Sequence, residues 1–309
     1  MKLRVVNRKS LTAEVEEFTL SCSEGGSLPT TDAGAHITLE TPSGARRRYS
    51  LVHSGALLSA YTIAVKRESS SRGGSESMHT QAQIGVELDA QPPENQFPLD
   101  TTRAALLIAG GIGITPIYAM AQTLEENKLR YRLVYCARQE QLAPYLNELK
   151  SLCGTKLTTH FDQGDPAKLF DFWDLLAEPT NENVYCCGPT PLMEEVKGVT
   201  GHWPEGRVHF EEFKPVESVR ADDQAFAVEL ARSKQIVHVK ANQTILEALR
   251  EHGVPVASSC ESGTCGTCKC PYVKGEVEHR DLVLMEEEKK SYIMPCVSRA
   301  IGTHLVLDL

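Results

Sequence analysis

The stretch CESGTCGTCKC, residues 260–270, places four cysteines within eleven positions and decides how the last part of the chain folds. Structural zinc sites generally take two pairs of closely spaced ligands, but the pair Cys265 and Cys268 has no second pair downstream. Cys260 extends this pair to a C-x4-C-x2-C pattern, and Cys296 follows after 27 intervening residues. This arrangement is the plant-type spacing for a [2Fe–2S] cluster.

The loop itself supports this interpretation, because a cluster needs small residues that bring backbone N–H groups close to its sulfurs. Between and beside the cysteines the chain has Ser262, Gly263, Thr264, Gly266 and Thr267. The predicted metal ligands are Cys260, Cys265, Cys268 and Cys296, and a zinc-binding interaction domain is the alternative. Cys270 lies two positions beyond the loop, where a strand is expected to begin, and is predicted to be a small packed residue.

The bulk composition predicts a soluble, globular protein. The chain has 309 residues, of which 41% are hydrophobic and 24% are charged. A formal charge of -9 and the lack of a dense Lys/Arg block argue against nucleic acid or an anionic membrane as a partner. The sequence shows neither a signal peptide nor an apolar run of about 18 residues, so a cytoplasmic location is predicted. There the cysteines are expected to be ligands or packed thiols rather than disulfides.

The order of expected strands and helices predicts a multidomain protein with three domains and a linker. Residues 1–102 alternate short β-like runs with turns, which predicts an antiparallel β-barrel. Residues 103–213 alternate strands with helices, which predicts a doubly wound α/β domain with parallel strands. The polar residues 214–224 are typical of a linker. Residues 225–309 combine a hairpin, a helix and the cysteine loop in an α+β ferredoxin domain.

The α/β domain carries two turns that lead from a strand into a helix. The first is IAGGIGITP, residues 108–116, where glycines let backbone N–H groups approach a pyrophosphate at a helix N-terminus. Its candidate nucleotide-binding residues are Gly110, Gly111, Gly113, Thr115 and Pro116. The second is YCCGPTPLM, residues 185–193. Cys186 is expected to lie in the core, on the face of the strand opposite Cys187.

The cysteine loop resembles the plant-type ferredoxin domain of the phthalate dioxygenase reductase family. The likeness continues through GEVEHRDLVL and CVSRA to the C-terminal LVLDL and covers nearly the whole chain. In the wider ferredoxin–NADP reductase superfamily a C-G-P tripeptide lies beside the nicotinamide, and Cys187, Gly188 and Pro189 match it. The resemblance implies that Cys187 positions the nicotinamide rather than forming a covalent bond with it.

The same resemblance implies a flavin in the barrel. Arg47, Tyr49 and Ser50 match an R-x-Y-S motif. In that motif the arginine contacts the flavin phosphate, the tyrosine packs against the rings, and the serine lies near the reactive nitrogen. Ser50 and Cys187 are therefore the residues expected next to the reacting atoms. The alternative interpretation of these residues is that the arginines only place charge on an edge strand of the sheet.

Two further segments of the barrel are candidates for flavin binding by resemblance. RGGS, residues 72–75, is similar to the stretch that binds the phosphate of FMN, which makes Gly73, Gly74 and Ser75 candidates. The alternative for this segment is a flexible loop. Ala64, Val65 and Lys66 match the strand that lines the isoalloxazine. Phe213 is a candidate for packing on the flavin, with an ordinary core phenylalanine as the alternative.

The identities of the flavin and of the nicotinamide nucleotide are inferred mainly from the family. FMN is expected by overall resemblance, with FAD as the alternative. Only Arg138 is basic after the strand YRLVYCA, and THFDQGD supplies Asp162 and Asp165. An acidic or neutral pocket disfavours a 2'-phosphate, which favours NADH over NADPH.

These features predict an NADH-dependent flavin iron–sulfur oxidoreductase. A nicotinamide gives up two electrons as hydride, whereas a [2Fe–2S] cluster accepts one at a time, and a flavin connects the two. The resemblance implies the reductase component of a Rieske-type aromatic oxygenase system, present as a monomer, with the terminal oxygenase as partner. The alternatives are a reductase for a demethylase, a carnitine-type monooxygenase or a soluble ferredoxin, and a redox-sensing or electron-carrier module. The sequence identifies neither the oxygenase nor its substrate.

Overall fold

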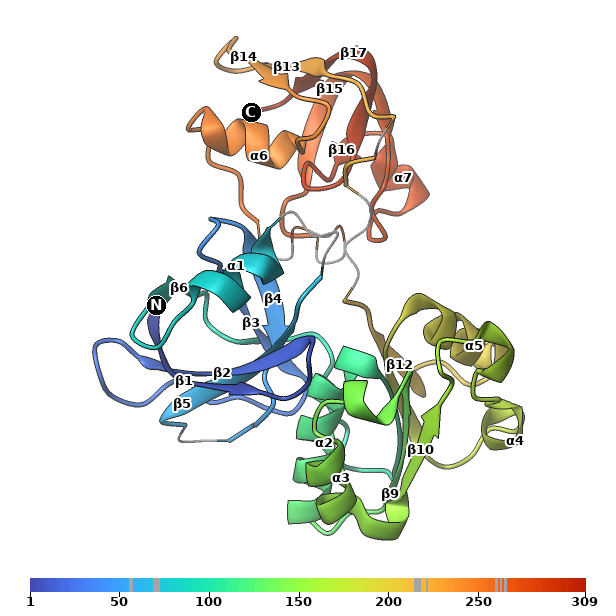
Figure 1. Cartoon of the computed structure of the whole chain (residues 1–309). Helices are drawn as coiled ribbons and strands as arrows, with labels where there is room; N and C mark the ends of the chain where they lie inside the picture. The colour runs from blue at the N-terminus through green and yellow to red at the C-terminus, as the bar shows by residue number, and fades with distance from the viewer. Residues whose placement is uncertain are drawn as a thin grey trace. The chain divides into compact units, whose positions relative to one another are not determined.

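The computed structural model describes residues 1–55, 58–68, 73–213, 218–220, 222–258, 261, 263 and 266–309 (Figure 1). The chain forms two compact units, Met1–Phe213 and Lys214–Leu309. The first unit contains the expected barrel and α/β regions, and the second contains the cysteine loop. No helix among the described residues is long and apolar enough to cross a membrane.

The N-terminal region consists of two antiparallel sheets and one helix. The order in the first sheet is β5-β2-β1-β6, and in the second it is β4-β3-β7. Side chains from both sheets, among them Phe18 and Ile37, share one apolar core, so the two sheets enclose it as in a small barrel. The elements are β1 (Lys2–Ser10), β2 (Val15–Cys22), β3 (Ala35–Glu40), β4 (Arg46–Ser50), β5 (Ala60–Lys66), α1 (Gly74–Gln81), β6 (Glu87–Asp89) and β7 (Glu94–Asn95).

The following region is an α/β layer structure built on five parallel strands in the order β10-β9-β8-β11-β12. Apolar side chains of the sheet pack on both of its faces, against α2 and α3 on one face and α4 and α5 on the other. The main elements are β8 (Ala105–Gly110), α2 (Ile114–Glu126), β9 (Tyr131–Ala137), α3 (Leu146–Cys153), β10 (Leu157–Phe161), α4 (Trp173–Leu176), β11 (Asn183–Cys187), α5 (Thr190–Thr200) and β12 (Val208–Glu211). Short 3-10 turns are Gly111–Gly113, Glu140–Leu142, Gly154–Lys156 and Pro166–Lys168.

The path of the chain through this sheet determines where a ligand can bind. From β8 the chain proceeds outward to β9 and β10, then returns to the other side of β8 for β11 and β12. The direction of winding therefore reverses between β8 and β11. In open parallel sheets, ligands bind in the crevice at the carboxyl ends of the strands at such a point. The segment after β8 is the turn in IAGGIGITP, residues 108–116, which we call the glycine turn. The segment after β11 is the turn in YCCGPTPLM, residues 185–193, which we call the C-G-P turn.

The second unit has a five-stranded sheet in the order β14-β13-β17-β15-β16, with α6 packed against it. A capping box starts α6, because the Thr244 hydroxyl accepts from the Glu247 N–H and the Glu247 carboxylate accepts from the Thr244 N–H. The elements are β13 (Phe226–Leu230), β14 (Ile236–Val239), α6 (Ile245–Glu251), β15 (Cys270–Glu278), α7 (Glu286–Lys289), β16 (Tyr292–Ile293) and β17 (Arg299–Leu307).

Part of the predicted linker is attached to this second unit. Arg280 donates to both carboxylate oxygens of Asp223, at 2.6 and 3.0 Å, and Arg299 lies 3.4 Å from the same carboxylate. All three side chains are buried. Because a buried carboxylate needs such partners, the chain at Asp223 is held to β17 and to the residues that follow β15.

Candidate functional site

At the point where the winding reverses, the glycine turn and the C-G-P turn contact each other through their backbones. A Cβ added to Gly113 would lie 2.3 Å from the carbonyl oxygen of Cys187, and one added to Gly110 would lie 2.5 Å from Cδ of Pro189. Gly188 also lies close to Gly110, with 3.0 Å from its added Cβ to the Gly110 nitrogen. Only glycine permits this contact. The two predicted nucleotide turns therefore form one surface.

The remaining residues of the glycine turn are arranged for access by a ligand. Gly111 has a φ of +53°, and nothing lies within 4 Å of the position of a Cβ there. The Tyr135 hydroxyl donates to the Gly111 carbonyl at 3.2 Å, which turns that carbonyl toward the domain core. Thr115 and Pro116 are buried in the first turn of α2, where the Thr115 hydroxyl donates to the Ile112 carbonyl at 3.2 Å. These residues shape the turn from inside, while Gly111 borders open space.

The two adjacent cysteines of β11 face opposite sides of the sheet, as predicted for Cys186. Cys186 belongs to the core beneath α4 and α5, whereas Cys187 packs with the core beneath α2. Burial raises the pKa of the Cys187 thiol well above its ordinary value, and the nearby carboxylate of Glu211 acts in the same direction. Cys187 is therefore a neutral thiol, which suits packing against a ligand rather than nucleophilic attack.

Glu211 is a site residue that the motif analysis missed. It is the last residue of β12 and pairs in register with Cys187 of β11. The Ser50 hydroxyl, from the barrel strand β4, donates to its carboxylate at 3.4 Å. Burial raises the pKa of Glu211 to about 7, against the smaller opposing effects of the Arg48 charge and the Ser50 hydrogen bond. In the sequence, Glu211 is visible as an acidic residue of HFEEF, residues 209–213. Its place beside Cys187 and Ser50, however, follows only from the pairing of β11 with β12 and from the contact with β4.

Ser50 lies on the same strand as the two other residues of the R-x-Y-S motif. Strand β4 is at the edge of its sheet and pairs with β3, with Tyr49 opposite Ile37 and Arg47 opposite Leu39. Burial raises the pKa of the Tyr49 hydroxyl, and the ring packs against the barrel core. An added Cβ on Gly74 would lie 3.2 Å from Nε of Arg47. The arginine thus lies at the N-terminus of α1.

The start of α1 has the features of an anion site. Gly73 occupies its N-cap with a φ of 84°, and among the described residues no side chain forms a capping hydrogen bond there. The first N–H groups of such a helix, together with an adjacent arginine, suit a phosphate. The Ser75 hydroxyl accepts from the Glu68 N–H at 3.1 Å. Arg72 lies outside the described residues.

The candidates on β5 differ in their surroundings. Val65 packs into the barrel core, whereas Ala64 packs into the core that includes Ile114 of α2. Lys66 extends outward and donates to Glu68 at 2.9 Å. Phe213 is 38% exposed, so it is not the core phenylalanine of the alternative interpretation.

The residues predicted to select the nucleotide meet at one edge of the sheet. The loop after β10 is hydrogen-bonded to the end of β9, with the Gln163 N–H donating to the Arg138 carbonyl at 2.8 Å. Asp162 accepts from the Gly164 N–H at 2.6 Å. Asp165 instead accepts from the Ala167 N–H and pairs with Lys168. Of the two acids, Asp162 is the one directly beside the end of β9.

In the second unit, Cys268 and Cys296 belong to the same buried cluster, although Cys268 precedes β15 in the chain and Cys296 follows it. Both are 2% exposed and belong to one small cluster with Leu246, Leu284, Met294 and Val297. Gly263, with a φ of +74°, packs so closely that an added Cβ would lie 2.8 Å from Val297. Cys260 and Cys265 lie outside the described residues. A cysteine pair at the edge of a glycine-bearing loop fits an iron–sulfur centre.

Cys270 lies in a different environment. It belongs to the core between the sheet and α6, together with Phe226 and Ile293. Burial raises the pKa of its thiol to about 12. The prediction that Cys270 is a packed residue is confirmed.

Known proteins match this chain both by region and over its full length. The 2Fe-2S iron-sulfur cluster binding domain model matches residues 228–300, and the oxidoreductase NAD-binding domain model matches residues 107–168. Phthalate dioxygenase reductase of Burkholderia cepacia is 43% identical, with 100% of this chain and 97% of that protein covered. The phthalate 4,5-dioxygenase oxygenase reductase subunit of Pseudomonas putida is 41% identical, with coverage of 99% and 96%.

A solved structure gives the same result for the fold. It is described as phthalate dioxygenase reductase, a modular structure for electron transfer from pyridine nucleotides to [2Fe–2S]. Its TM-score is 0.91 at 42% identity, and 100% of this chain and 98% of that chain are covered. The predicted multidomain fold is thus confirmed.

The two matched domains define an oxidoreductase that combines NAD binding with a [2Fe–2S] centre. With 43% identity over its full length, the chain belongs to the phthalate dioxygenase reductase family. Members of this family contain FMN, and the arginine at the open N-terminus of α1 fits that group.

Proposed function

We propose that the protein is the NADH-dependent reductase component of a Rieske-type aromatic oxygenase system. The single observation that carries this proposal is the contact between Gly113 and Cys187, which joins the two nucleotide turns into one surface. Glu211 lies beside Cys187 in the sheet and accepts a hydrogen bond from Ser50 of the barrel, so the predicted flavin and nicotinamide residues are neighbours. The names of the similar proteins, which are reductases of dioxygenase systems, support an oxygenase as the electron acceptor.

Within this proposal, the chain divides the cofactors among residues 1–102, residues 103–213 and, after a linker at 214–224, residues 225–309. A bound flavin supplies the conversion of a two-electron hydride into single electrons. The nicotinamide nucleotide is assigned to the two glycine turns, and the cluster is assigned to Cys260, Cys265, Cys268 and Cys296. The residues assigned to FMN are Arg47, Tyr49, Ser50, Ala64, Val65, Lys66, Gly73, Gly74, Ser75 and Phe213.

The chain's own residues position the reacting groups. Cys187 is a neutral, buried thiol at the end of β11, next to the two turns to which the nicotinamide is assigned, and we assign to its bulk the orientation of that ring without a bond to it. Ser50 is held by Glu211 across the boundary between barrel and α/β region, so its oxygen has a fixed direction. A carboxyl with a pKa of about 7 is also able to hold or release a proton near neutral pH.

NADH is proposed rather than NADPH because of the charges at the edge of β9 and β10. Asp162 lies beside the end of β9, through the hydrogen bond from its N–H to the Ala137 carbonyl. A carboxylate there accepts from a ribose hydroxyl and repels a 2'-phosphate. Arg138, directly after β9, is exposed, and Lys168 of the next loop pairs with Asp165.

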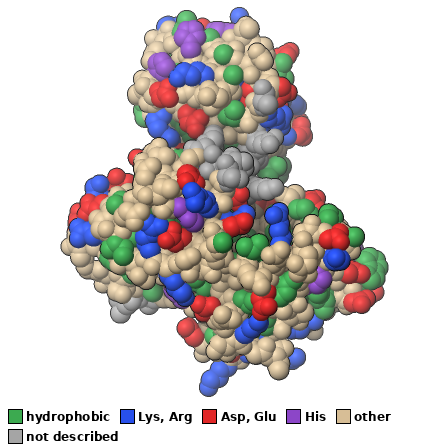
Figure 2. Space-filling view, viewed as in Figure 1, with side chains coloured by type: hydrophobic (Ala, Val, Ile, Leu, Met, Phe, Trp, Pro, Cys, Tyr) green, Lys and Arg blue, Asp and Glu red, His purple; other side chains and the backbone are tan. Residues whose placement is uncertain are grey.

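The remaining proposals concern the location of the protein in the cell, its oligomeric state and its partners. We propose a cytoplasmic monomer that binds neither nucleic acid nor membrane. Acidic and basic side chains are interspersed on the face shown in Figure 2, and a mixed surface of this kind does not attract polyanions strongly.

An anaerobic titration of the purified protein with NADH and, separately, NADPH tests the function. Uptake of about three electrons per protein, two at the flavin and one at the cluster, with bleaching of both absorbance bands and NADH as the better donor, is expected. Identification of the released flavin by chromatography distinguishes FMN from FAD. Reduction by neither nucleotide would refute the proposal.

The cluster assignment has its own test. Serine at Cys260, Cys265, Cys268 or Cys296 should abolish the low-temperature spin-resonance signal of the reduced cluster, whereas Cys270→Ser should retain it. Cys270 is the matched control, since it is as buried as Cys268 and lies two residues away. Loss of the signal in Cys270→Ser together with its retention in Cys296→Ser would show that the ligand assignment is wrong.

A further inference from the structure

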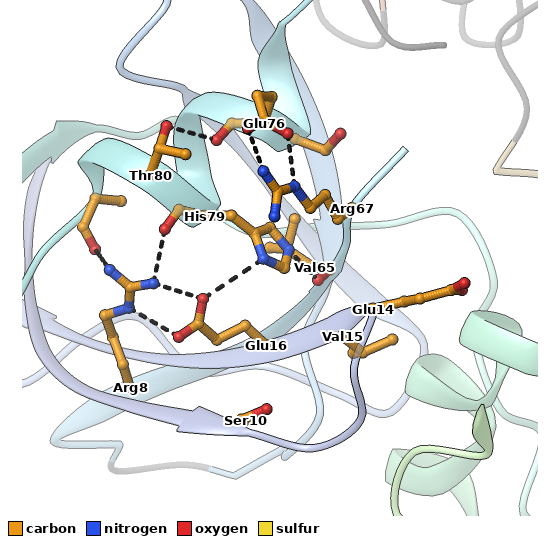
Figure 3. Close-up of polar contacts among 12 residues, drawn as sticks. Arg8, Ser10, Glu14, Val15, Glu16, Val65, Arg67, Glu76, His79 and Thr80 are labelled. Atoms are coloured by element: carbon orange, nitrogen blue, oxygen red, sulfur yellow. Dashed lines mark hydrogen bonds and ion pairs between the residues drawn. The ribbon is translucent and has the colours of Figure 1, made fainter. Parts of the chain in front are cut away.

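A cluster of polar side chains lies beneath α1 in the barrel, and none of its members is among the residues assigned to the cofactors (Figure 3). It consists of Arg8 on β1, Glu16 on β2 and His79 in the last turn of α1, and we call it the α1 anchor. The anchor side chains are largely buried, with exposures of 15% for Arg8, 20% for Glu16 and 11% for His79. Polar groups at such depth are held by directed hydrogen bonds.

His79 connects α1 directly to β5. Its Nε2 lies 2.9 Å from the carbonyl oxygen of Val65. A carbonyl only accepts hydrogen bonds, so Nε2 carries the proton and donates. Its Nδ1 faces the Glu16 carboxylate at 3.6 Å, and Figure 3 shows the imidazole ring between Glu16 and Val65. The ring therefore spans from the helix to the backbone of a strand assigned to the flavin rings.

Arg8 holds the same turn of α1 from the β1 side. Its guanidinium donates to both Glu16 oxygens, at 2.5 and 3.1 Å, and to the backbone carbonyl of His79 at 2.8 Å. It also donates to the carbonyl of Ala82, just after the helix, at 3.4 Å. These are carbonyls at a helix C-terminus, which lack partners within the helix. Arg8 thus fixes the end of α1, and His79 fixes the distance from α1 to β5.

The opposite end of the same helix is the proposed phosphate site. Helix α1 has eight residues and His79 is the sixth, so about one and a half turns separate its first N–H groups from His79. Because a short helix moves as a rigid body, a shift at His79 displaces Gly74 relative to Arg47. Val65 and Gly74 belong to the two segments assigned to the ring system and the phosphate of FMN, and the buried side chain of His79 joins α1 to the first of them.

We propose that His79 is a positioning residue for the flavin. It sets the spacing between the phosphate site at the start of α1 and the ring site on β5. This inference rests on the proposed assignment of FMN to these two segments. His79 does not touch the flavin in this proposal, and its effect is transmitted through the position of α1.

The Arg67–Glu76 pair provides a matched control on the same helix. It also ties α1 to the end of β5, with two hydrogen bonds of 2.5 and 2.7 Å. Its side chains are 51% and 42% exposed, however, and exposed ion pairs contribute little to stability. Removal of this pair should therefore have far less effect than removal of the buried hydrogen bond from His79.

The experiment measures how fast FMN leaves the full-length holoprotein after dilution, followed by the recovery of flavin fluorescence. His79→Leu removes the donor, and His79→Gln places an amide N–H near the original Nε2. Loss of one buried hydrogen bond corresponds to about tenfold in an equilibrium constant. We expect His79→Leu to release FMN about tenfold faster, and His79→Gln and Arg67→Gln to release it within about threefold of the wild-type rate.

The outcomes separate this inference from the function on which it rests. Wild-type protein without bound FMN would refute the flavin assignment itself. Wild-type release from His79→Leu, or release from His79→Gln as fast as from His79→Leu, would overturn the positioning role. If His79→Leu does not fold, His79→Asn replaces it, because the shorter amide does not reach Val65. The KM for NADH with ferricyanide as acceptor, at saturating FMN, should stay at the wild-type value.

Discussion

In the first unit, α1 begins at Gly74 and α2 begins directly after Gly113. The two helices are held in different ways. The start of α2 rests on backbone, since Gly113 lies against the carbonyl of Cys187. The start of α1 rests on a side chain, because Gly74 lies against Arg47, and its end is held by the α1 anchor. The position of the nucleotide turn is therefore set by backbone sterics, whereas the position of the flavin helix depends on hydrogen bonds that mutations can adjust.

The largest effect is expected for Gly113→Ala. Its Cβ would be placed 2.3 Å from the Cys187 carbonyl oxygen, and a backbone atom cannot rotate away. Overpacking of this kind costs about 1–3 kcal/mol or more, and the separated turns should raise the KM for NADH about tenfold or more. Urea unfolding followed by tryptophan fluorescence measures the loss, since Trp173 and Trp203, the two tryptophans of the chain, both lie in the first unit.

Gly111→Ala is the control for this prediction, because it changes the same turn without a clash. Nothing lies within 4 Å of its Cβ position, but its φ is +53°. A non-glycine residue in this conformation costs about 1–2 kcal/mol. Gly113 itself has an ordinary helical φ of -60°, so destabilisation by Gly113→Ala no larger than that by Gly111→Ala would contradict the explanation by backbone contact.

An intermediate effect is expected for Gly74→Ala, the same change at the other helix. Its Cβ would lie 3.2 and 3.3 Å from Nε and Cγ of Arg47, which is a flexible side chain. Alanine also favours a helix over glycine by about 1 kcal/mol, so the free energy of unfolding should not fall. FMN release should quicken by about threefold to tenfold as Arg47 is displaced. Destabilisation as large as in Gly113→Ala would remove the difference between the two helices.

The last prediction, for Glu211→Gln, concerns how stability changes with pH rather than the stability at one pH. Burial raises the pKa of Glu211 from 4.5 to about 7, so between these values the folded protein holds a proton that the unfolded chain releases. This group therefore lowers the free energy of unfolding as pH rises through that range, and its effect is constant above about pH 7. Glutamine should remove this contribution. Identical pH dependence in mutant and wild type, measured by urea unfolding from about pH 5 to about pH 8, would contradict the prediction.

The sequence predicts best where a function needs a fixed local spacing. The cysteine pattern of residues 260–270, with Cys296 downstream, indicated the iron–sulfur domain without any knowledge of the fold. The strand, glycine turn and helix around Gly110 likewise indicated the nucleotide domain. In both cases the chemistry requires particular residues at neighbouring positions, so the pattern can be recognised in the sequence alone.

The sequence predicts least where a contact depends on packing between distant segments. Glu211 meets Ser50 across 161 positions, and neither strand alone signals the pair. His79 follows the RGGS segment and belongs to no motif, and its partners Arg8 and Val65 become visible only when β1, β5 and α1 assemble. The exposure of Phe213 also could not be read from the motif HFEEF.

The burial of the thiols described above has a consequence for chemical labelling. Among the described cysteines, Cys22 on β2 is partly exposed and the others are buried. Burial raises the pKa of Cys136 to about 12, and those of Cys153, Cys186 and Cys187 are also raised. Alkylating reagents and peroxides attack thiolates, so these neutral thiols react slowly. Cys22 thus offers a natural attachment point for a spectroscopic probe on the barrel, without removal of any core cysteine.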